Sequence, residues 1–258
     1  TIVMTSATLS VQQKFRYYFS RVGLDRVPES RIQTAILGTP FKFDEQALLC
    51  IGSDMVPPDD RNFGDDTVEC LRRILGITRG HALVLFTSFY ALDHAHKNLH
   101  VELRKAGIIP LKQGEATRTQ LLERFRTDIS SVLFATDSFW EGIDVMGEAL
   151  SCLVITRLPF AVPSDPIILA RAETFDDAFN QYYLPDAILR FRQGFGRLIR
   201  SKDDFGIVVV LDKRILTKSY GKMILRSLPG CTARQGPVAT LPELARRWLN
   251  PELRQSPN

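Results

Sequence analysis

The stretch SVLFA, residues 131–135, is an uncharged run that the polar run TDSFWEGID, residues 136–144, follows directly. A short apolar run that ends at turn-forming residues is typical of a strand buried on both faces. Three further runs have the same character, namely ALVLF at 82–86, LSCLVIT at 150–156 and GIVVVL at 206–211. Strands of this kind occur in parallel sheets whose two faces are covered by helices.

Helical patterns lie between and after these runs. They extend from Tyr90 to about Ala106, from Thr117 to Thr127, from Pro185 to about Ile199 and from Leu241 to Leu249. Thr117 is placed to cap its helix, and proline is favoured in a first helical turn. Strands that alternate with helices predict an α/β protein with a doubly wound, mostly parallel sheet.

The composition is that of a globular protein, with 45% hydrophobic and 24% charged residues among 258. These fractions exclude collagen, low-complexity disorder and coiled coil. No linker divides the chain, so we expect one domain over residues 1–258. Within it we expect an irregular N-terminal portion over 1–60, with a strand at Thr1–Met4, and a C-terminal helix and tail over 236–258.

The four cysteines occupy positions 50, 70, 152 and 231, far apart in the sequence. Zinc and iron–sulfur sites normally include at least one close pair of cysteines, so we expect neither in this chain. Cysteines that are few and scattered favour reduced thiols in a cytoplasmic protein. No secretory signal and no apolar run of about 18 residues is visible, so we expect no membrane partner.

Positive charge is concentrated in one part of the chain. The net charge of the whole is +4, whereas residues 187–226 contain ten basic and three acidic residues and carry +7. Such a concentration indicates a phosphate-bearing partner. A solvated basic helix face is the alternative interpretation.

The run QGFGRLIR, residues 193–200, lies inside this basic segment. Arg197 and Arg200 are three apart, so on a helix they project from one face. Guanidinium groups are suited to bidentate contacts with phosphate oxygens, and Gly196 lets another surface approach them. An exposed basic helix end is the alternative here.

The loop after residues 131–135 offers a second candidate site, because ligands bind at the carboxyl ends of strands in doubly wound sheets. Thr136 can donate to phosphates, and Glu141 and Asp144 can accept from ribose hydroxyls, water or a basic partner. Gly142 adopts backbone shapes closed to other residues. The alternative is a polar loop anchored in the core by Trp140.

Four motifs in order resemble motifs III to VI of superfamily 2 helicases. They are TSATL at 5–9, FTS at 86–88, FWEGID at 139–144 and QGFGRLIR at 193–200. The set is similar to the DinG branch of the DinG/XPD-like helicases, and the FWEG run favours DinG over XPD. The resemblance extends from Thr5 to about Pro229 and implies a RecA-like second motor domain of an ATP-dependent DNA helicase. It implies a role in DNA repair or replication.

The resemblance assigns roles around an ATP cleft. Arg200 is the expected arginine finger and Arg197 a second phosphate contact. Ser6 and Thr8 are expected to couple the nucleotide state to the hinge between two lobes. The residues expected to line the ATP cleft are Gln193, Gly196, Gly142, Asp144 and Glu141.

The resemblance also assigns a DNA surface on the opposite edge. Backbone phosphates are expected to contact Thr87, Ser88, Gln113 and Thr136, and Trp140 is expected either to stack on a base or to pack in the core. Lys213 and Arg214 are expected to add electrostatic attraction. The implied partners are single-stranded DNA, forked duplex DNA and the N-terminal motor domain of the same protein.

Two family motifs are missing from this sequence, the Walker A loop that ends in Gly-Lys-Thr/Ser and the Asp-Glu-Ala-His box. ATP and Mg²⁺ are therefore expected to be bound mainly by a missing first motor lobe, and the isolated chain is expected not to hydrolyse ATP. An iron–sulfur cluster is expected only elsewhere in a parent protein. A non-catalytic nucleic-acid-binding or regulatory module is the alternative function.

Three histidines, at 94, 96 and 100, raise the question of a metal site. His96 and His100 are spaced i, i+4, but lysines on the same helix favour a solvated face. We expect no metal ligand in this chain.

Overall fold

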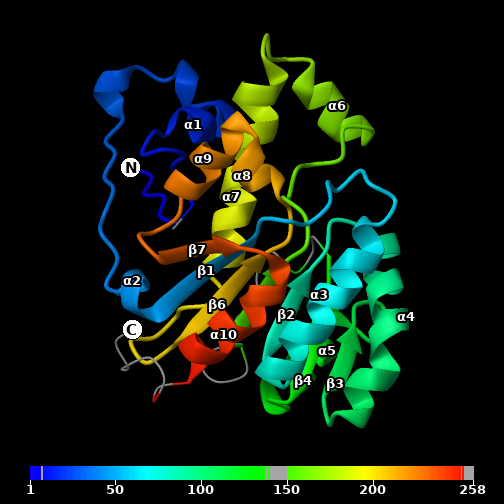
Figure 1. The fold of residues 1–258 in the computed structure, drawn as a ribbon. Coiled ribbons are helices and arrows are strands. Elements are labelled where there is room, and N and C mark those ends of the chain that lie inside the picture. Colours follow the sequence, from blue (N-terminus) through cyan, green and yellow to red (C-terminus); the bar gives the residue numbers. More distant parts are fainter. Residues whose placement is uncertain (7, 137–138, 140–149, 251, 253–258) are drawn as a thin grey trace.

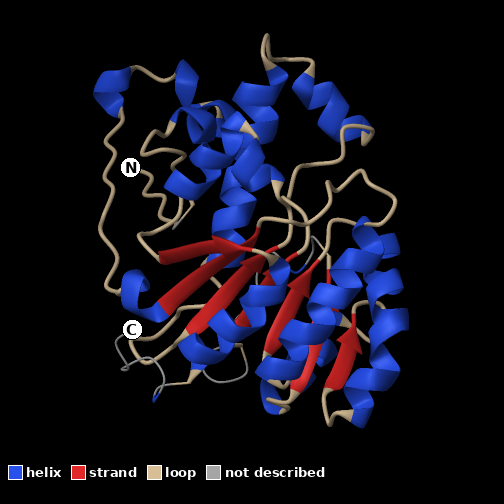
Figure 2. Cartoon of the chain, viewed as in Figure 1, coloured by secondary structure: helices blue, strands red, loops and turns tan. Residues whose placement is uncertain are grey.

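The computed structural model describes residues 1–6, 8–136, 139, 150–250 and 252. In this part of the chain, seven parallel strands form one sheet in the order β3-β4-β2-β5-β6-β1-β7. All strands point toward the same edge (Figure 2), which we call the carboxyl edge, and they begin at the amino edge. The strands are β1 Ala47–Gly52, β2 Ala82–Leu85, β3 Ile109–Lys112, β4 Ser131–Ala135, β5 Cys152–Ile155, β6 Gly206–Val210 and β7 Thr232–Gly236.

Helices cover both faces of the sheet (Figure 1). Alternate residues of each inner strand enter different apolar clusters. In β1, for example, Leu48 and Cys50 pack with α3, α4 and α10, whereas Leu49 and Ile51 pack on the side of α5, α7 and α9. The α-helices of the described chain are α1 Arg16–Val22, α2 Phe43–Gln46, α3 Phe63–Thr78, α4 Phe89–Lys105, α5 Arg118–Thr127, α6 Pro166–Ala172, α7 Leu184–Phe195, α8 Arg214–Thr217, α9 Ser219–Arg226 and α10 Leu241–Leu249, and a π-helix over Phe179–Tyr183 leads directly into α7.

The four strands predicted from apolar runs are β2, β4, β5 and β6, and the predicted α/β class with a parallel sheet is confirmed. Thr117 caps α5 as expected, in a capping box with Gln120. The sequence analysis missed β1, β3 and β7. The predicted strand at Thr1–Met4 is absent: these residues lack strand pairing, and Ile2 and Val3 are more than 80% exposed.

The cysteines of the described chain are all free thiols. Burial raises the pKa of both Cys50 and Cys70 to about 12, so these thiols stay protonated at neutral pH. They pack as small apolar side chains. None of the helices in the described ranges is long and apolar enough to cross a lipid bilayer.

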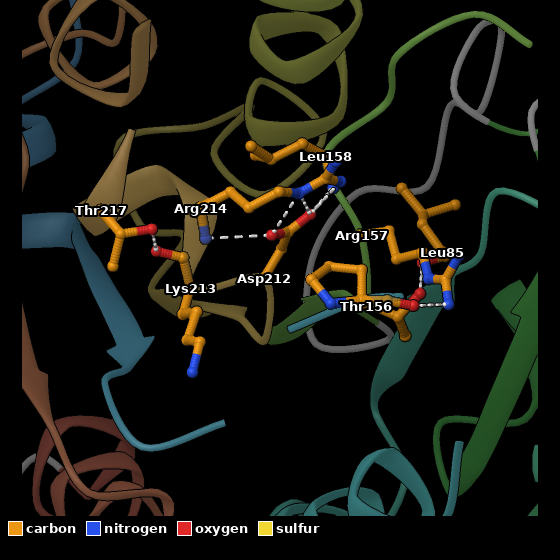
Figure 3. Close-up of polar contacts among 9 residues, drawn as sticks. Leu85, Thr156, Arg157, Leu158, Asp212, Lys213, Arg214 and Thr217 are labelled. Carbon is orange, nitrogen blue, oxygen red and sulfur yellow. Dashed lines mark hydrogen bonds and ion pairs between the residues drawn. The ribbon is translucent and has the colours of Figure 1, made fainter. Parts of the chain in front are cut away.

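A buried carboxylate joins the loops at the carboxyl edge (Figure 3). Asp212, directly after β6 and Leu211, is fully buried and accepts a hydrogen bond of 2.9 Å from the backbone N–H of Leu158, in the loop after β5. Arg214 donates to the same carboxylate through Nε at 2.9 Å and Nη2 at 2.6 Å. Burial disfavours the charged guanidinium, but its bonds to Asp212 outweigh burial and raise the pKa of Arg214. The pair holds the β5 and β6 loops together.

Two further bonds extend this connection to β2 and α3. Thr156 Oγ1 donates to the carbonyl oxygen of Leu85, the last residue of β2, at 3.0 Å. Arg157 donates to the carbonyl oxygen of Pro58, in the loop before α3, and its guanidinium lies 4.8 Å from the ring centre of Phe63. The central loops of this edge therefore have fixed relative positions.

Replacing Asp212 by alanine tests the buried pair. Asp212→Ala leaves Arg214 without its carboxylate and the N–H of Leu158 without its acceptor, so the free energy of unfolding should fall by about 3 kcal/mol. Urea unfolding followed by circular dichroism measures the change. Asp203→Ala, at an exposed aspartate in the loop before β6, should change it by less than about 0.5 kcal/mol. Equal effects of the two substitutions would contradict the importance of the pair.

Candidate functional site

The last turn of α7 contacts the N-terminal segment. Gln193 Nε2 donates to Thr8 Oγ1 at 3.5 Å, and the Nη1 atom of Arg192 donates to the carbonyl oxygen of Ser10. Thr8 in turn donates its backbone N–H to Ser6 Oγ at 3.2 Å. The structure therefore brings the expected cleft residue Gln193 together with the two expected coupling residues, Ser6 and Thr8.

Gln193 has unused hydrogen-bonding capacity within the described chain. Its Oε1 atom is buried, and no described group donates to it. Buried amide oxygens normally have a donor, so an unpaired one at a candidate site indicates a place for a further polar group. This atom belongs to the residue that already contacts Thr8.

Arg197 and Arg200 do not lie on the helix that was predicted for them. The expected helix continued to about Ile199, but α7 ends at Phe195 with Gly196 as its C-cap. Glycine is a poor helix former, and Leu198 and Ile199 turn inward to become part of the core. The two arginines are half-buried; Arg197 lies in the turn after α7, and Arg200 lies in the irregular segment that follows.

Polar contacts hold this loop at the amino edge of the sheet. The Asp204 carboxylate accepts from the backbone N–H of Arg200 at 2.7 Å and of Ser201 at 2.8 Å. Gln46, which lies directly before β1 and is buried, donates through Nε2 to the carbonyl oxygens of Ser201 and Asp204, both at 2.9 Å. The backbone at Arg200 is thus fixed by its neighbours, although it is not helical.

Residues predicted to bind DNA follow three adjacent strands at the carboxyl edge. Gln113, after β3, accepts at Oε1 from the backbone N–H of Thr136 at 2.7 Å and from its hydroxyl at 3.1 Å. Thr136 itself follows β4. Thr87 and Ser88 follow β2, and the Ser88 hydroxyl caps α4 by accepting from the N–H of Ala91 at 3.2 Å. Since β3, β4 and β2 are neighbours, these four residues share one edge.

Some predicted site residues cannot be placed. Trp140, Glu141, Gly142 and Asp144 lie outside the described residues, and their roles stay predictions. Gly196 is exposed at the end of α7.

Arg214, which was expected with Lys213 to add electrostatic attraction for DNA, forms an ion pair of 2.6 Å with Asp212. The attraction by these two residues stays a prediction. The supporting residues Asp212, Asp204 and Gln46 were not assigned roles from the sequence. For Asp212 a signal existed, since an acidic residue directly after an apolar strand and two before an arginine is placed for a local ion pair.

The three histidines lie on α4 and have protein neighbours. His94 Nε2 is 2.9 Å from Asp65 Oδ1, and the ring of His96 stacks on that of His100 with centroids 5.3 Å apart. Within the described ranges, histidine, cysteine and acidic side chains form no cluster of three or more that could hold a metal ion.

Sequence comparisons find relatives among bacterial helicases. The chain is 35% identical over 235 residues to the ATP-dependent DNA helicase YoaA of Haemophilus influenzae, an alignment that covers 88% of this chain and 35% of that protein. It is 36% identical over 239 residues to a Bacillus subtilis protein named 3'-5' exonuclease DinG, with 89% of this chain and 25% of that protein covered. The chain thus spans about a third or less of the length of these relatives.

Structure comparisons agree on the fold. An XPD helicase matches with a TM-score of 0.57 and 19% identity, over 73% of this chain and 36% of its own. Dbp5 of S. cerevisiae, in a complex with RNA and ADP BeF3, matches with a TM-score of 0.54 and 18% identity, over 92% of this chain and 54% of its own. The "Helicase C-terminal domain" model matches residues 71–231. The expected resemblance to DinG-type helicases is confirmed, and the chain belongs to the helicase C-terminal domain family.

Proposed function

We propose that this chain is the second motor lobe of an ATP-dependent DNA helicase. In this proposal it closes over a nucleotide held by the N-terminal motor lobe and moves along single-stranded DNA, opening forked duplexes during repair or replication. The observation that carries the proposal is the separation of two residue sets by one sheet. Of the expected nucleotide residues, Gln193, Arg197 and Arg200 lie by the last turn of α7 and the amino edge. The expected DNA residues Thr87, Ser88, Gln113 and Thr136 lie at the carboxyl edge.

On the nucleotide side, Arg200 is the proposed arginine finger, with Arg197 as a second cation. Guanidinium groups stabilise the negative charge that develops as a phosphoryl group is transferred, provided their positions are fixed beforehand. The hydrogen bonds of Asp204 and Gln46 around residues 200–204 support such fixation. The unpaired Oε1 of Gln193 gives the same region a hydrogen-bond acceptor. Bound ATP with Mg²⁺ would supply the phosphoryl group, its ligands coming mainly from the other lobe.

The contact between Thr8 and Gln193 is the proposed coupling element. Thr8 and Ser10 contact the end of α7, and the loop with Arg197 and Arg200 begins directly after this helix. A displacement of Thr8 and Ser10 against α7 therefore changes the surroundings of Gln193 and the start of the arginine loop together.

On the DNA side, the proposed contacts are hydrogen bonds to backbone phosphates from the loops after β2, β3 and β4. Contacts to phosphate carry no sequence information, which suits a motor that must move along any strand. The bond between Gln113 and Thr136 keeps the β3 and β4 loops at a fixed separation.

Arg200→Ala tests the arginine finger in the protein that carries both lobes. We expect DNA-stimulated ATP turnover to fall by on the order of 10³-fold, because the charge of the transition state loses its main cation from this lobe. Arg226→Ala, at an exposed arginine on α9, is the matched control and should leave turnover unchanged. Unchanged turnover in Arg200→Ala would favour the alternative of a non-catalytic module. The isolated chain should show no ATP hydrolysis above the buffer rate.

Thr8→Val tests the coupling contact in the same protein. The substitution removes the hydroxyl that accepts from Gln193, so base pairs unwound per ATP hydrolysed should fall by roughly ten-fold while DNA binding stays within two-fold. Gln193→Ala also removes the Oε1 acceptor, so its loss should be at least as large. The double variant should lose no more than Gln193→Ala alone, since that substitution already removes the contact with Thr8. Additive losses in the double variant would show that the two residues act independently.

A further inference from the structure

Two aromatic side chains at the start of α4 stand outside the core. Phe89 is 53% exposed and Tyr90 is 84% exposed. The buried stripe of the same helix consists of Leu92, Ala95, Leu99 and Leu103. In the described part of the chain, no ring or cation stacks on Phe89 or Tyr90. Packing within the domain therefore does not explain why aromatic side chains occupy these two exposed positions.

The start of α4 holds these rings in a fixed place. Ser88 precedes them, and its hydroxyl caps the helix by accepting from the N–H of Ala91. Three residues before Phe89, Phe86 donates its N–H to the carbonyl oxygen of Ala135, the last residue of β4, at 2.8 Å, and this bond joins the end of β2 to the end of β4. Phe89 and Tyr90 thus lie at the carboxyl edge, as do Thr136 and Gln113, which follow the neighbouring strands β4 and β3.

Charge at this part of the edge is nearly balanced. Lys112, the last residue of β3, forms an ion pair of 3.1 Å with Asp93 on α4. The turn after β3 contributes Glu115, and the start of α5 contributes Arg118. Among the described residues of these loops, positive and negative side chains therefore cancel. Attraction of phosphates by net charge is weak here, so affinity for a strand needs another source.

We propose that Phe89 and Tyr90 form a stacking platform for the unpaired bases of single-stranded nucleic acid. The inference rests on the proposed function and adds a base contact to its phosphate contacts. Stacking of a base on an aromatic ring is favourable for every base, so it gives affinity without sequence preference. The bases of a duplex are already stacked on one another, so the platform selects single strands over duplex. Stacking does not involve the 2′-hydroxyl of the sugar, so the platform does not distinguish DNA from RNA.

Binding to two matched oligonucleotides tests the platform. The probes are a fluorescein-labelled thymidine oligonucleotide of about 12 nucleotides and an abasic strand of the same length, which keeps the phosphates and lacks the bases. Fluorescence anisotropy should show that the unaltered chain binds the thymidine strand at least about five-fold more tightly. Tyr90→Ala should reduce this preference to less than about two-fold and leave binding of the abasic strand unchanged.

Control variants separate stacking from other effects. Tyr90→Trp should keep the preference, because a larger ring still stacks, and Tyr90→Phe should keep it because the hydroxyl is not required. Val101→Ala, at another 53% exposed position on α4, should not change binding of either strand. Phe89→Ala should lower the preference in the same direction as Tyr90→Ala.

The outcomes distinguish this inference from the proposed function. A preference that persists in the Phe89→Ala, Tyr90→Ala double variant would overturn the platform while leaving the nucleic-acid surface in place. Equal weakening of both strands by Tyr90→Ala would also overturn it, since that points to a phosphate contact. Failure of the unaltered chain to bind either strand would contradict the proposed nucleic-acid surface itself, and the platform with it.

Discussion

The structure depends on burying parallel strands on both faces. Each inner strand directs alternate side chains into two separate apolar clusters, and residues of β2, β5 and β6 are fully buried. Burial of each large aliphatic side chain contributes about 1.5–3 kcal/mol, so neither face can be left uncovered. In a parallel sheet every connection must cross from the carboxyl edge back to the amino edge, and here helices make most of these crossings. Polar residues therefore collect at two edges, which the sheet keeps apart.

Buried polar groups then fix the loops at these edges. Asp212 holds the loops after β5 and β6, and Gln46 with Asp204 holds the loop before β6 against the start of β1. A buried carboxylate is costly to desolvate, and its bonds to Arg214 and to the N–H of Leu158 offset that cost. An apolar contact would tolerate small shifts, whereas a bidentate ion pair has a defined geometry. These buried polar groups thus hold the loops at each edge in one defined arrangement.

The sequence predicts the core of this fold better than its periphery. Apolar runs such as SVLFA identify central strands, because both faces are buried and no polar residue interrupts them. The β1 sequence ALLCIG is an apolar run of the same kind, but the irregular sequence pattern of the first sixty residues obscured it. In contrast, β3 contains Pro110, and β7 is the polar edge strand TARQG, so neither has the pattern of a buried strand. The end of α7 also depended on tertiary structure, since burial of Leu198 and Ile199 outweighs a helical continuation.

For the candidate site, too, the sequence predicts some features and not others. The order of motifs predicts which residues gather, because motif order in a chain reflects the topology of the fold. It does not predict which of them bond to each other, as with Gln193 and Thr8 or Gln113 and Thr136, since such pairs are more than 20 residues apart.

Helix α7 connects the N-terminal segment to the loop that carries Arg197 and Arg200, because it contacts that segment and leads directly into the loop. At its first turn Asp186 accepts from the Tyr17 hydroxyl at 3.3 Å, and at its last turn Gln193 donates to Thr8. The 12 residues of this helix span about 18 Å, so the N-terminal segment contacts it at two separate places, through Thr8 in the last turn and through Tyr17 in the first.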